Sequence, residues 1–190
     1  MIGNFIGDYV KGKKYLEYPE PIQQGILLHR AIDSFTDRHP NFRTVKSLLN
    51  PTYGLYSGVV TDIFIDHFLA ANWQSFHPVR LEEYTQRVYK TMHDYYSYLP
   101  DRIKGFFNNL VERNRLLSYA EISGVEEALM IMSFRTSLPG KSNEAMKLLK
   151  DQYPLLKQLS IQFIKEIDLY IKNEQVNAVV QNDLHPAGEE

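Results

Sequence analysis

The sequence contains no cysteine among its 190 residues. Disulfide bonds, thiolate zinc sites and a cysteine nucleophile are therefore excluded. It also lacks an apolar run of the length that a membrane span requires. Its opening residues, MIGNFIGDYVKGKK, have no basic start followed by an apolar core and a small-residue cleavage site, so they do not read as a signal peptide. We therefore expect a cytoplasmic protein with no membrane partner.

An excess of positive charge is missing as well. The chain has 21 lysines and arginines against 23 acidic residues, which gives a formal net charge of -2. No global basic field favours nucleic acid, so we expect no nucleic-acid partner. Apolar residues make up 44% of the chain and charged residues 23%, which is typical of a globular domain with a substantial core.

The pattern that is present is helical. Apolar residues recur at helical spacing almost throughout, and no strand-like alternation is sustained. We predict an all-α fold, a single-domain multi-helix bundle over residues 1–180, with a frayed tail over residues 181–190. Ser123 and Glu126 have the spacing of a capping box and predict the start of a late helix.

One predicted helix combines apolar residues with a polar stripe. It begins after Pro19 and contains the segment GILLHRAIDSFTD, residues 25–37. Side chains four positions apart on a helix lie above one another, so His29, Asp33 and Asp37 share one face. Asp37 lies near the predicted helix end, where a cap or a surface position is its simplest interpretation.

A second predicted helix, from Tyr56 to Trp73, is apolar on nearly all sides, which is typical of the middle of a bundle. It nevertheless carries Asp62, Asp66 and His67. Because an unpaired buried charge is very costly, buried charges form ion pairs or bind metal. Imidazole and carboxylate together form a ligand set for Zn, Mn or Fe, and two facing helices can build such a site in a bundle core.

Each of these side chains also has a purely structural interpretation. Asp33 could pair with His29 or Arg30 on its own helix, and Asp66 could pair with an arginine elsewhere in the fold. His39, His77, His93 and His185 lie in polar contexts and are interpreted as solvated.

Basic residues follow an early carboxylate. Asp8 lies in NFIGDYVKGKK, directly before three lysines, Lys11, Lys13 and Lys14. The functional interpretation places Asp8 near the core site and the lysines at its rim, where they would attract a phosphate or an acidic protein. The structural alternative is a short amphipathic helix with a solvated face. Arg135, in MIMSFR, has two equally open interpretations. It could bind a phosphate, or it could form a structural ion pair.

Three blocks together resemble the acyl carrier protein phosphodiesterase family, also called acyl carrier protein hydrolase. They are GNFIGDYVKG, GILLHRAIDSFTDRHP and DIFIDHFLAANW, in this order, with a looser match at MSFR. The resemblance covers most of the chain, and its specificity lies in the first seventy-odd residues. It implies an HD-like helical fold, distantly related to the HD metal phosphohydrolases, although Asp66 and His67 stand in the reverse of the usual His-Asp order.

The resemblance implies removal of 4′-phosphopantetheine from the serine of holo acyl carrier protein, with a divalent cation, preferably Mn²⁺. By matching motif, the expected metal ligands are Asp8, His29, Asp66 and His67. The expected catalytic residues are Asp8, Arg30 and Asp33. The expected substrate-binding residues are Lys11, Lys13, Lys14 and Arg135. The oligomeric state does not follow from the resemblance.

Family members usually carry a further histidine-containing block ahead of the GNF block, whereas this chain starts at MIGNF. A start assigned to an internal methionine and a shorter family member are both open interpretations. Two other functions also stay open. One is the same metal-dependent chemistry on a nucleotide or another small ester, and the other is a non-catalytic helical interaction protein that binds no metal.

Overall fold

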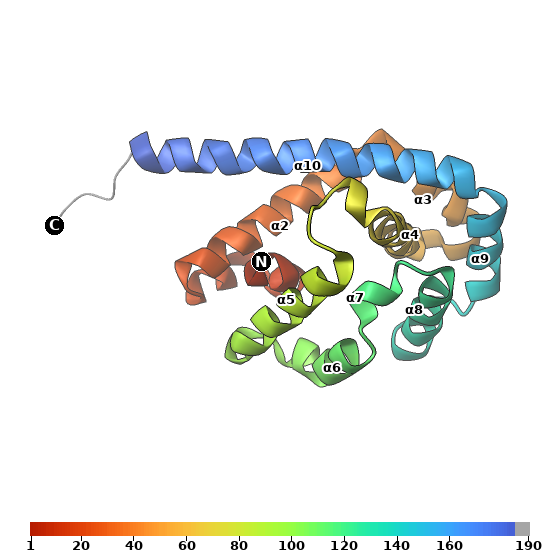
Figure 1. The fold of residues 1–190 in the computed structure, drawn as a ribbon, viewed down its shortest axis with the longest axis horizontal. Helices are drawn as coiled ribbons and strands as arrows, with labels where there is room; N and C mark the ends of the chain where they lie inside the picture. The colour runs from red at the N-terminus through yellow and green to blue at the C-terminus, as the bar shows by residue number, and fades with distance from the viewer. Residues whose placement is uncertain (185–190) are drawn as a thin grey trace.

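The computed structural model describes the backbone of residues 1–184 and the side chains of residues 1–174. This part of the chain contains helices and turns without a strand, which confirms the all-α prediction (Figure 1). The α-helices are α1 (Ile2–Ile6), α2 (Glu20–Arg38), α3 (Pro40–Tyr53), α4 (Ser57–Ala71), α5 (Leu81–Asp94), α6 (Asp101–Glu112), α7 (Arg115–Ser118), α8 (Ile122–Arg135), α9 (Ser142–Asp151) and α10 (Tyr153–Leu184). Short 3₁₀ helices intervene at η1 (Gly7–Tyr9), η2 (Gly12–Glu17), η3 (Gly54–Tyr56), η4 (Trp73–Ser75) and η5 (Tyr96–Tyr98).

The long helix α10 runs across one side of the bundle and covers α2, α3 and α4 (Figure 1). It continues to Leu184, so residues 181–184 of the predicted tail are helical, and residues 185–190 lie outside the described residues. No helix within residues 1–184 combines the length and the hydropathy of a membrane span.

Helix α4 lies in the middle of the bundle, as its composition predicts, and packs against α3, α8 and α10. Phe64 and Phe68 are completely buried in a core formed mainly by α3, α4, α8, α9 and the start of α10. A second core joins α1, α2, α5 and α6 around Ile6, Ile26 and Ile103. Helices α2 and α4 thus contribute to different main cores, and they meet in a smaller cluster that includes Phe35 of α2 and Ile65 of α4.

The first helix approaches α2 unusually closely. A Cβ atom at Gly3 would lie 2.0 Å from the carbonyl oxygen of Ile22, and one at Gly25 would lie 2.9 Å from the amide nitrogen of Asn4. The two glycines therefore allow the backbones of α1 and α2 to touch. This contact fixes the short α1–η1 segment over the middle of α2, which places Asp8 above His29.

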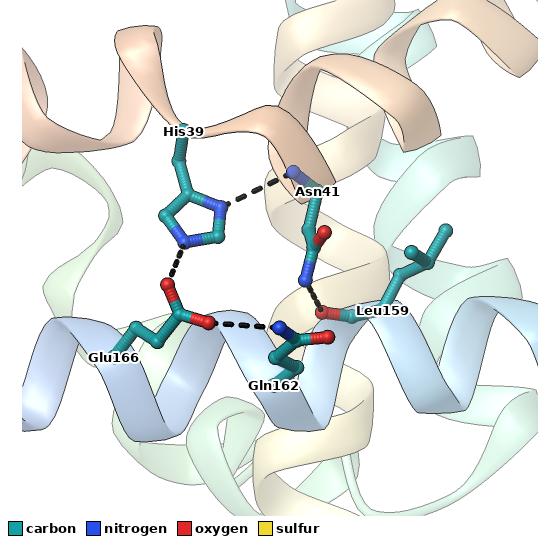
Figure 2. Close-up of polar contacts among 5 residues, drawn as sticks. All are labelled: His39, Asn41, Leu159, Gln162 and Glu166. Carbon is teal, nitrogen blue, oxygen red and sulfur yellow. Dashed lines mark hydrogen bonds and ion pairs between the residues drawn. The ribbon is translucent and has the colours of Figure 1, made fainter.

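The corner between α2 and α3 is fixed by His39, which is only 5% exposed. Figure 2 shows its ring between the start of α3 and the middle of α10. Nδ1 accepts a hydrogen bond from the backbone N–H of Asn41 at 3.2 Å and caps α3, while Nε2 donates to Glu166 at 2.9 Å. Gln162 donates to the other oxygen of Glu166. The interpretation of His39 as solvated is therefore wrong.

The predicted capping box is also wrong. Helix α8 begins at Ile122, two residues earlier than a cap at Ser123 requires, and Glu121 occupies the N-cap position without a side-chain hydrogen bond. Packing explains the shift: Gly124 lies so close to the preceding helix α7 that a Cβ there would be 1.9 Å from the carbonyl oxygen of Ser118. Tertiary contact, rather than a local cap, fixes this helix start.

Candidate functional site

Asp8, His29 and Asp33 meet at the surface of α2. Their ligand atoms all lie within 4.8 Å of one another. Nε2 of His29 is 3.4 Å from a carboxylate oxygen of Asp8 and 3.2 Å from one of Asp33. Both carboxylates are exposed, whereas the imidazole is largely buried. The group is thus open to solvent on its acidic side and anchored by its histidine, and we refer to it as the His29 cluster.

Gly7 explains how η1 comes so close to the histidine. A Cβ at this position would lie 2.3 Å from the Cγ and Cδ2 atoms of His29, so only glycine leaves room for the ring. Any side chain at residue 7 would displace the imidazole or lift η1, and with it Asp8, away from α2. The glycine of the GD pair is therefore a geometric requirement of the His29 cluster.

Arg30 holds the chain that follows Asp8. Its Nη2 donates to the carbonyl oxygens of Val10 at 3.0 Å and Gly12 at 2.7 Å, and its guanidinium lies 5.1 Å from the ring centre of Tyr15. These contacts tie the segment that joins η1 and η2 to α2 across 20 and 18 sequence positions. Arg30 therefore positions the loop that carries Asp8.

The His29 cluster fits a metal ion on its geometry. Nε2 of His29 is buried and has no hydrogen-bond partner, although two carboxylates face it. Ligand atoms about 2.1 Å from a cation and 90–110° apart are separated by about 3.0–3.4 Å, which matches the two distances to Asp8 and Asp33. Nε2 lies at ion-pair distance from both carboxylates but is not hydrogen-bonded to either, and a cation between them would engage all three groups.

Further carboxylates face this group from the central helix. Protein atoms crowd around Asp62 and Asp66 on α4, although both side chains reach solvent. Burial raises the pKa of Asp66 to about 7. Burial also raises the pKa of Asp62 to about 7, with contributions from the negative charges of Asp66, Asp33 and Asp8. The charge of Asp62 is therefore coupled both to the carboxylates of the His29 cluster and to Asp66.

Asp33 is influenced by the same negative charges. Its pKa is raised, first by burial and then by the charges of Asp8 and Asp37, while His29 and Lys11 act in the opposite direction. Repulsion among so many carboxylates favours either protonation or the binding of a cation. Charge coupling thus links carboxylates of α2 and α4, while the group of possible ligand atoms contains no residue of α4.

His67 points elsewhere. It is 1% exposed, its Nδ1 donates to the carbonyl oxygen of Tyr119 at 2.9 Å, and its Nε2 accepts from the hydroxyl of Tyr153 at 3.0 Å. Burial lowers its pKa, which agrees with a neutral ring. Both nitrogens are engaged, so the structure does not bring His67 into the His29 cluster. Asp66 also lies outside the group of ligand atoms within 4.8 Å.

The three lysines differ in their relation to the cluster. Lys11 lines the same recess of about 110 Å³ as Asp8, His29 and Asp33. Lys13 and Lys14 are exposed on η2. Among the described side chains none of the three forms an ion pair, so their charges stay available at the rim.

Arg135 ends α8 and is exposed. Helix α8 packs against α4, α7 and α9, on the side of the bundle away from α1 (Figure 1). The described residues give it no hydrogen bond or ion pair with the His29 cluster. The structure therefore does not bring Arg135 together with the other predicted site residues.

No pattern in the sequence indicates the apolar cavity next to Asp66. It has a volume of about 150 Å³ and lies among α4, α5 and the α7 region. Trp73, Tyr84, Leu116 and Tyr119 contribute most of its aromatic and apolar wall, and Asp66 provides a carboxylate. These residues are scattered over more than fifty positions, so no local motif joins them.

Comparison with known proteins agrees with this geometry. Residues 1–167 match the family model described as acyl carrier protein phosphodiesterase. The chain is 25% identical over 177 residues to an acyl carrier protein phosphodiesterase of Yersinia pestis, covering 93% of this chain and 92% of the relative.

It is also 27% identical over 136 residues to a protein of the same name from Photorhabdus laumondii, covering 71% of this chain and 69% of the relative. No solved structure matches the chain. The family match includes η1, α2 and α4, which carry all the acidic groups of the recess. The chain therefore belongs to the acyl carrier protein phosphodiesterase family.

Proposed function

We propose that this protein hydrolyses the phosphodiester between 4′-phosphopantetheine and the serine of holo acyl carrier protein, which yields apo acyl carrier protein. Family membership supports the substrate, because the relatives carry the name of this activity. The observation that carries the chemistry is the His29 cluster, in which a buried imidazole nitrogen lies 3.2 and 3.4 Å from two carboxylates without a hydrogen bond to either.

We propose that Asp8, His29 and Asp33 hold a divalent cation, with Mn²⁺ as the candidate that the resemblance favours. When bound, such an ion stabilises charge on a phosphoryl oxygen and activates water for attack at phosphorus. The raised pKa of Asp33 is consistent with this role, because a nearby positive charge would restore its ionised form. We leave His67 and Asp66 out of this ligand set because they lie outside the cluster.

The basic residues of the same recess supply the second part of the proposal. Arg30 uses one nitrogen to hold the η1–η2 loop, and its other donors remain available beside Asp8. Together with Lys11 it offsets negative charge on the phosphodiester as the serine oxygen leaves. The repulsion between a phosphodiester and the surrounding carboxylates makes this compensation necessary.

The lysine rim provides a docking surface for the carrier. Lys11 lines the recess of the cluster, Lys13 and Lys14 follow it on η2, and an acidic protein surface would complement them. Docking there would bring the modified serine toward Asp8. We place the reaction in the cytoplasm, with holo acyl carrier protein as the partner.

Intact-mass spectrometry tests the proposal directly. Holo acyl carrier protein incubated with the protein and Mn²⁺ should lose the mass of phosphopantetheine, and EDTA should stop the loss. Asp8→Ala should be inactive, whereas Asp37→Ala, on the same stripe of α2 but outside the cluster, should keep its activity. An unchanged carrier mass with folded wild-type protein would contradict the proposal.

The alternatives give different results in the same setting. A phosphodiesterase of small esters would hydrolyse bis(4-nitrophenyl) phosphate but leave the carrier intact. Its activity would also survive replacement of the three lysines by glutamine, which should strongly impair a carrier-protein reaction. A non-catalytic interaction protein would bind the carrier without turnover and without a requirement for a cation.

A further inference from the structure

The cavity beside Asp66 is a separate feature from the His29 cluster, and the proposed hydrolysis does not by itself use it. It is lined by side chains from four segments and is partly open to solvent, and its wall is mainly apolar. A volume of about 150 Å³ is below the range of roughly 300–1,000 Å³ that is typical of drug-sized ligands. It therefore suits a thin, linear group better than a nucleotide base with its sugar.

An acidic stripe of α4 leads from the cluster to this cavity. Asp62 feels the charges of Asp8 and Asp33 on one side and of Asp66 on the other. Asp62 and Asp66 are one turn apart, which corresponds to about 6 Å along the helix axis. A chain that is anchored at the His29 cluster and follows α4 toward its C-terminal end therefore reaches the cavity.

The polar groups of the cavity are few and lie at defined places. Burial and the charge of Asp66 raise the pKa of Tyr119 to about 12, so its hydroxyl stays protonated and able to donate. Neither the Tyr119 hydroxyl nor the Asp66 carboxyl has a hydrogen-bond partner among the described residues. The hydroxyl of Thr85 donates to the backbone of Glu82 and retains a lone pair for accepting. Together they offer both donors and acceptors to a group that carries amides.

We infer that this cavity binds the pantetheine arm of the substrate, with its methylene segments against Trp73 and Tyr84 and an amide at Asp66 and Tyr119. The inference rests on the proposed function, because it assumes that the phosphate end of the arm lies at the His29 cluster. Beyond its branched, hydroxyl-bearing end at the phosphate, the arm is a linear chain of short methylene segments and amides, and a part of this chain matches the small volume and the sparse polar groups. Ala70 lies on the wall, on the same helix as Asp66.

The single tryptophan of the chain makes the inference directly measurable. Trp73 lines the cavity, and its indole N–H is already bound to the carbonyl oxygen of Val79 at 2.7 Å. A ligand that enters the cavity therefore changes the surroundings of the ring without competing for this hydrogen bond. The probe is pantetheine, which lacks phosphate and so does not depend on the cation site.

The test is a fluorescence titration of the full chain with pantetheine. Ala70→Leu fills the cavity and should weaken binding roughly tenfold or more, because hydrophobic pockets discriminate by about that factor per added group. The matched control is Ala71→Leu, next along the helix, exposed and outside the cavity wall, which should bind like the wild type. Tyr119→Phe removes one donor without adding volume and should weaken binding by a smaller factor.

Two results would overturn the inference. One is a wild-type emission that does not change saturably with pantetheine, and the other is equal affinity of Ala70→Leu and Ala71→Leu proteins that both have native circular dichroism. Turnover of holo carrier protein separates this failure from a failure of the proposed function. If Asp8→Ala is inactive while Ala70→Leu retains the wild-type KM, the proposed hydrolysis stands and the cavity has no part in it. If pantetheine binds as expected but the carrier mass never changes, the cavity site stands as a binding site and the hydrolysis fails.

Discussion

His29 and His67 are the two histidines of the predicted polar helices, and the structure treats them in opposite ways. His67 is fully enclosed and uses both nitrogens in hydrogen bonds to Tyr119 and Tyr153. His29 faces two carboxylates with a nitrogen that has no hydrogen-bond partner. A histidine whose hydrogen bonds are complete stabilises the fold, whereas one with an open nitrogen among carboxylates is available for chemistry.

His39 extends the comparison. Like His29 it pairs with a carboxylate, but its second nitrogen caps α3 (Figure 2). The aromatic rings of Phe35 and Phe163 also pack against it. Proximity of imidazole and carboxylate is thus common to a structural clamp and to a candidate metal site. What distinguishes them is whether the hydrogen-bonding capacity of the ring is already filled.

The largest expected effect is on activity. Replacing His29 by alanine removes the only nitrogen ligand of the cluster, so we expect the rate of carrier hydrolysis to fall by more than about 100-fold. Stability should change little, because the side chain forms no well-aligned hydrogen bond that would be lost. Steady-state kinetics with Mn²⁺ and thermal unfolding of the same samples check this. A destabilised protein with normal activity would reverse the comparison with His67.

The second effect is on stability. Replacing His67 by alanine leaves a cavity and unpairs the carbonyl oxygen of Tyr119, so we expect a loss of about 2–4 kcal/mol in the free energy of unfolding. Activity per folded molecule should stay close to that of the wild type. Urea unfolding followed by circular dichroism measures the first quantity. A loss of Mn²⁺ affinity equal to that of His29→Ala would place His67 among the ligands after all.

A third, smaller effect concerns pH. The folded-state pKa of Asp62 is raised to about 7, above the value of about 3.9 for an unfolded chain. The folded protein thus binds more protons between these values, and its free energy of unfolding falls as the pH rises from about 4 to about 7. Asp62→Asn should reduce this fall. Urea unfolding at pH 5 and pH 8 without divalent cations makes the comparison, and equal losses in both proteins would contradict it.

The smallest effect belongs to the clamp at His39. Hydrogen bonds from His39 and Gln162 lower the pKa of Glu166, so its contribution to stability is present above its unfolded pKa and is lost as the pH falls through the folded value. Glu166→Gln should therefore be slightly less stable than the wild type at pH 7, and the difference should vanish in acid. Thermal melts of both proteins across this range test the sign. A difference that grows on acidification would show that the clamp works in another way.

Much of this organisation follows from local sequence. The 3.6-residue pattern predicts the helices, and the apolar composition of residues 61–73 places α4 at the centre of the bundle. The four-residue spacing of His29 and Asp33 fixes them on one face, because the geometry of a helix depends only on backbone hydrogen bonds. The GNFIGD block marks Asp8 as a candidate site residue. The structure shows that Gly3 and Gly7 of this block lie in close contact with α2.

The capping box at Ser123 shows where local reasoning fails. Its spacing is correct, but the contact of Gly124 with α7 moves the helix start to Ile122. The cavity beside Asp66 could not be predicted from local sequence for a related reason, since its lining comes from segments that meet only after the helices have packed.

Three features follow from the amino-acid sequence alone: the positions of the helices along the chain, the central position of α4 and the polar stripe of α2. Only the tertiary structure decided that η1 lies on His29, that Tyr119 and Tyr153 complete the hydrogen bonds of His67, and that Glu166 reaches His39. Helix periodicity is a property of neighbouring residues and can be read along the chain. Whether a hydrogen bond forms between residues fifty to a hundred and thirty positions apart depends on how the helices pack, and no local pattern predicts it.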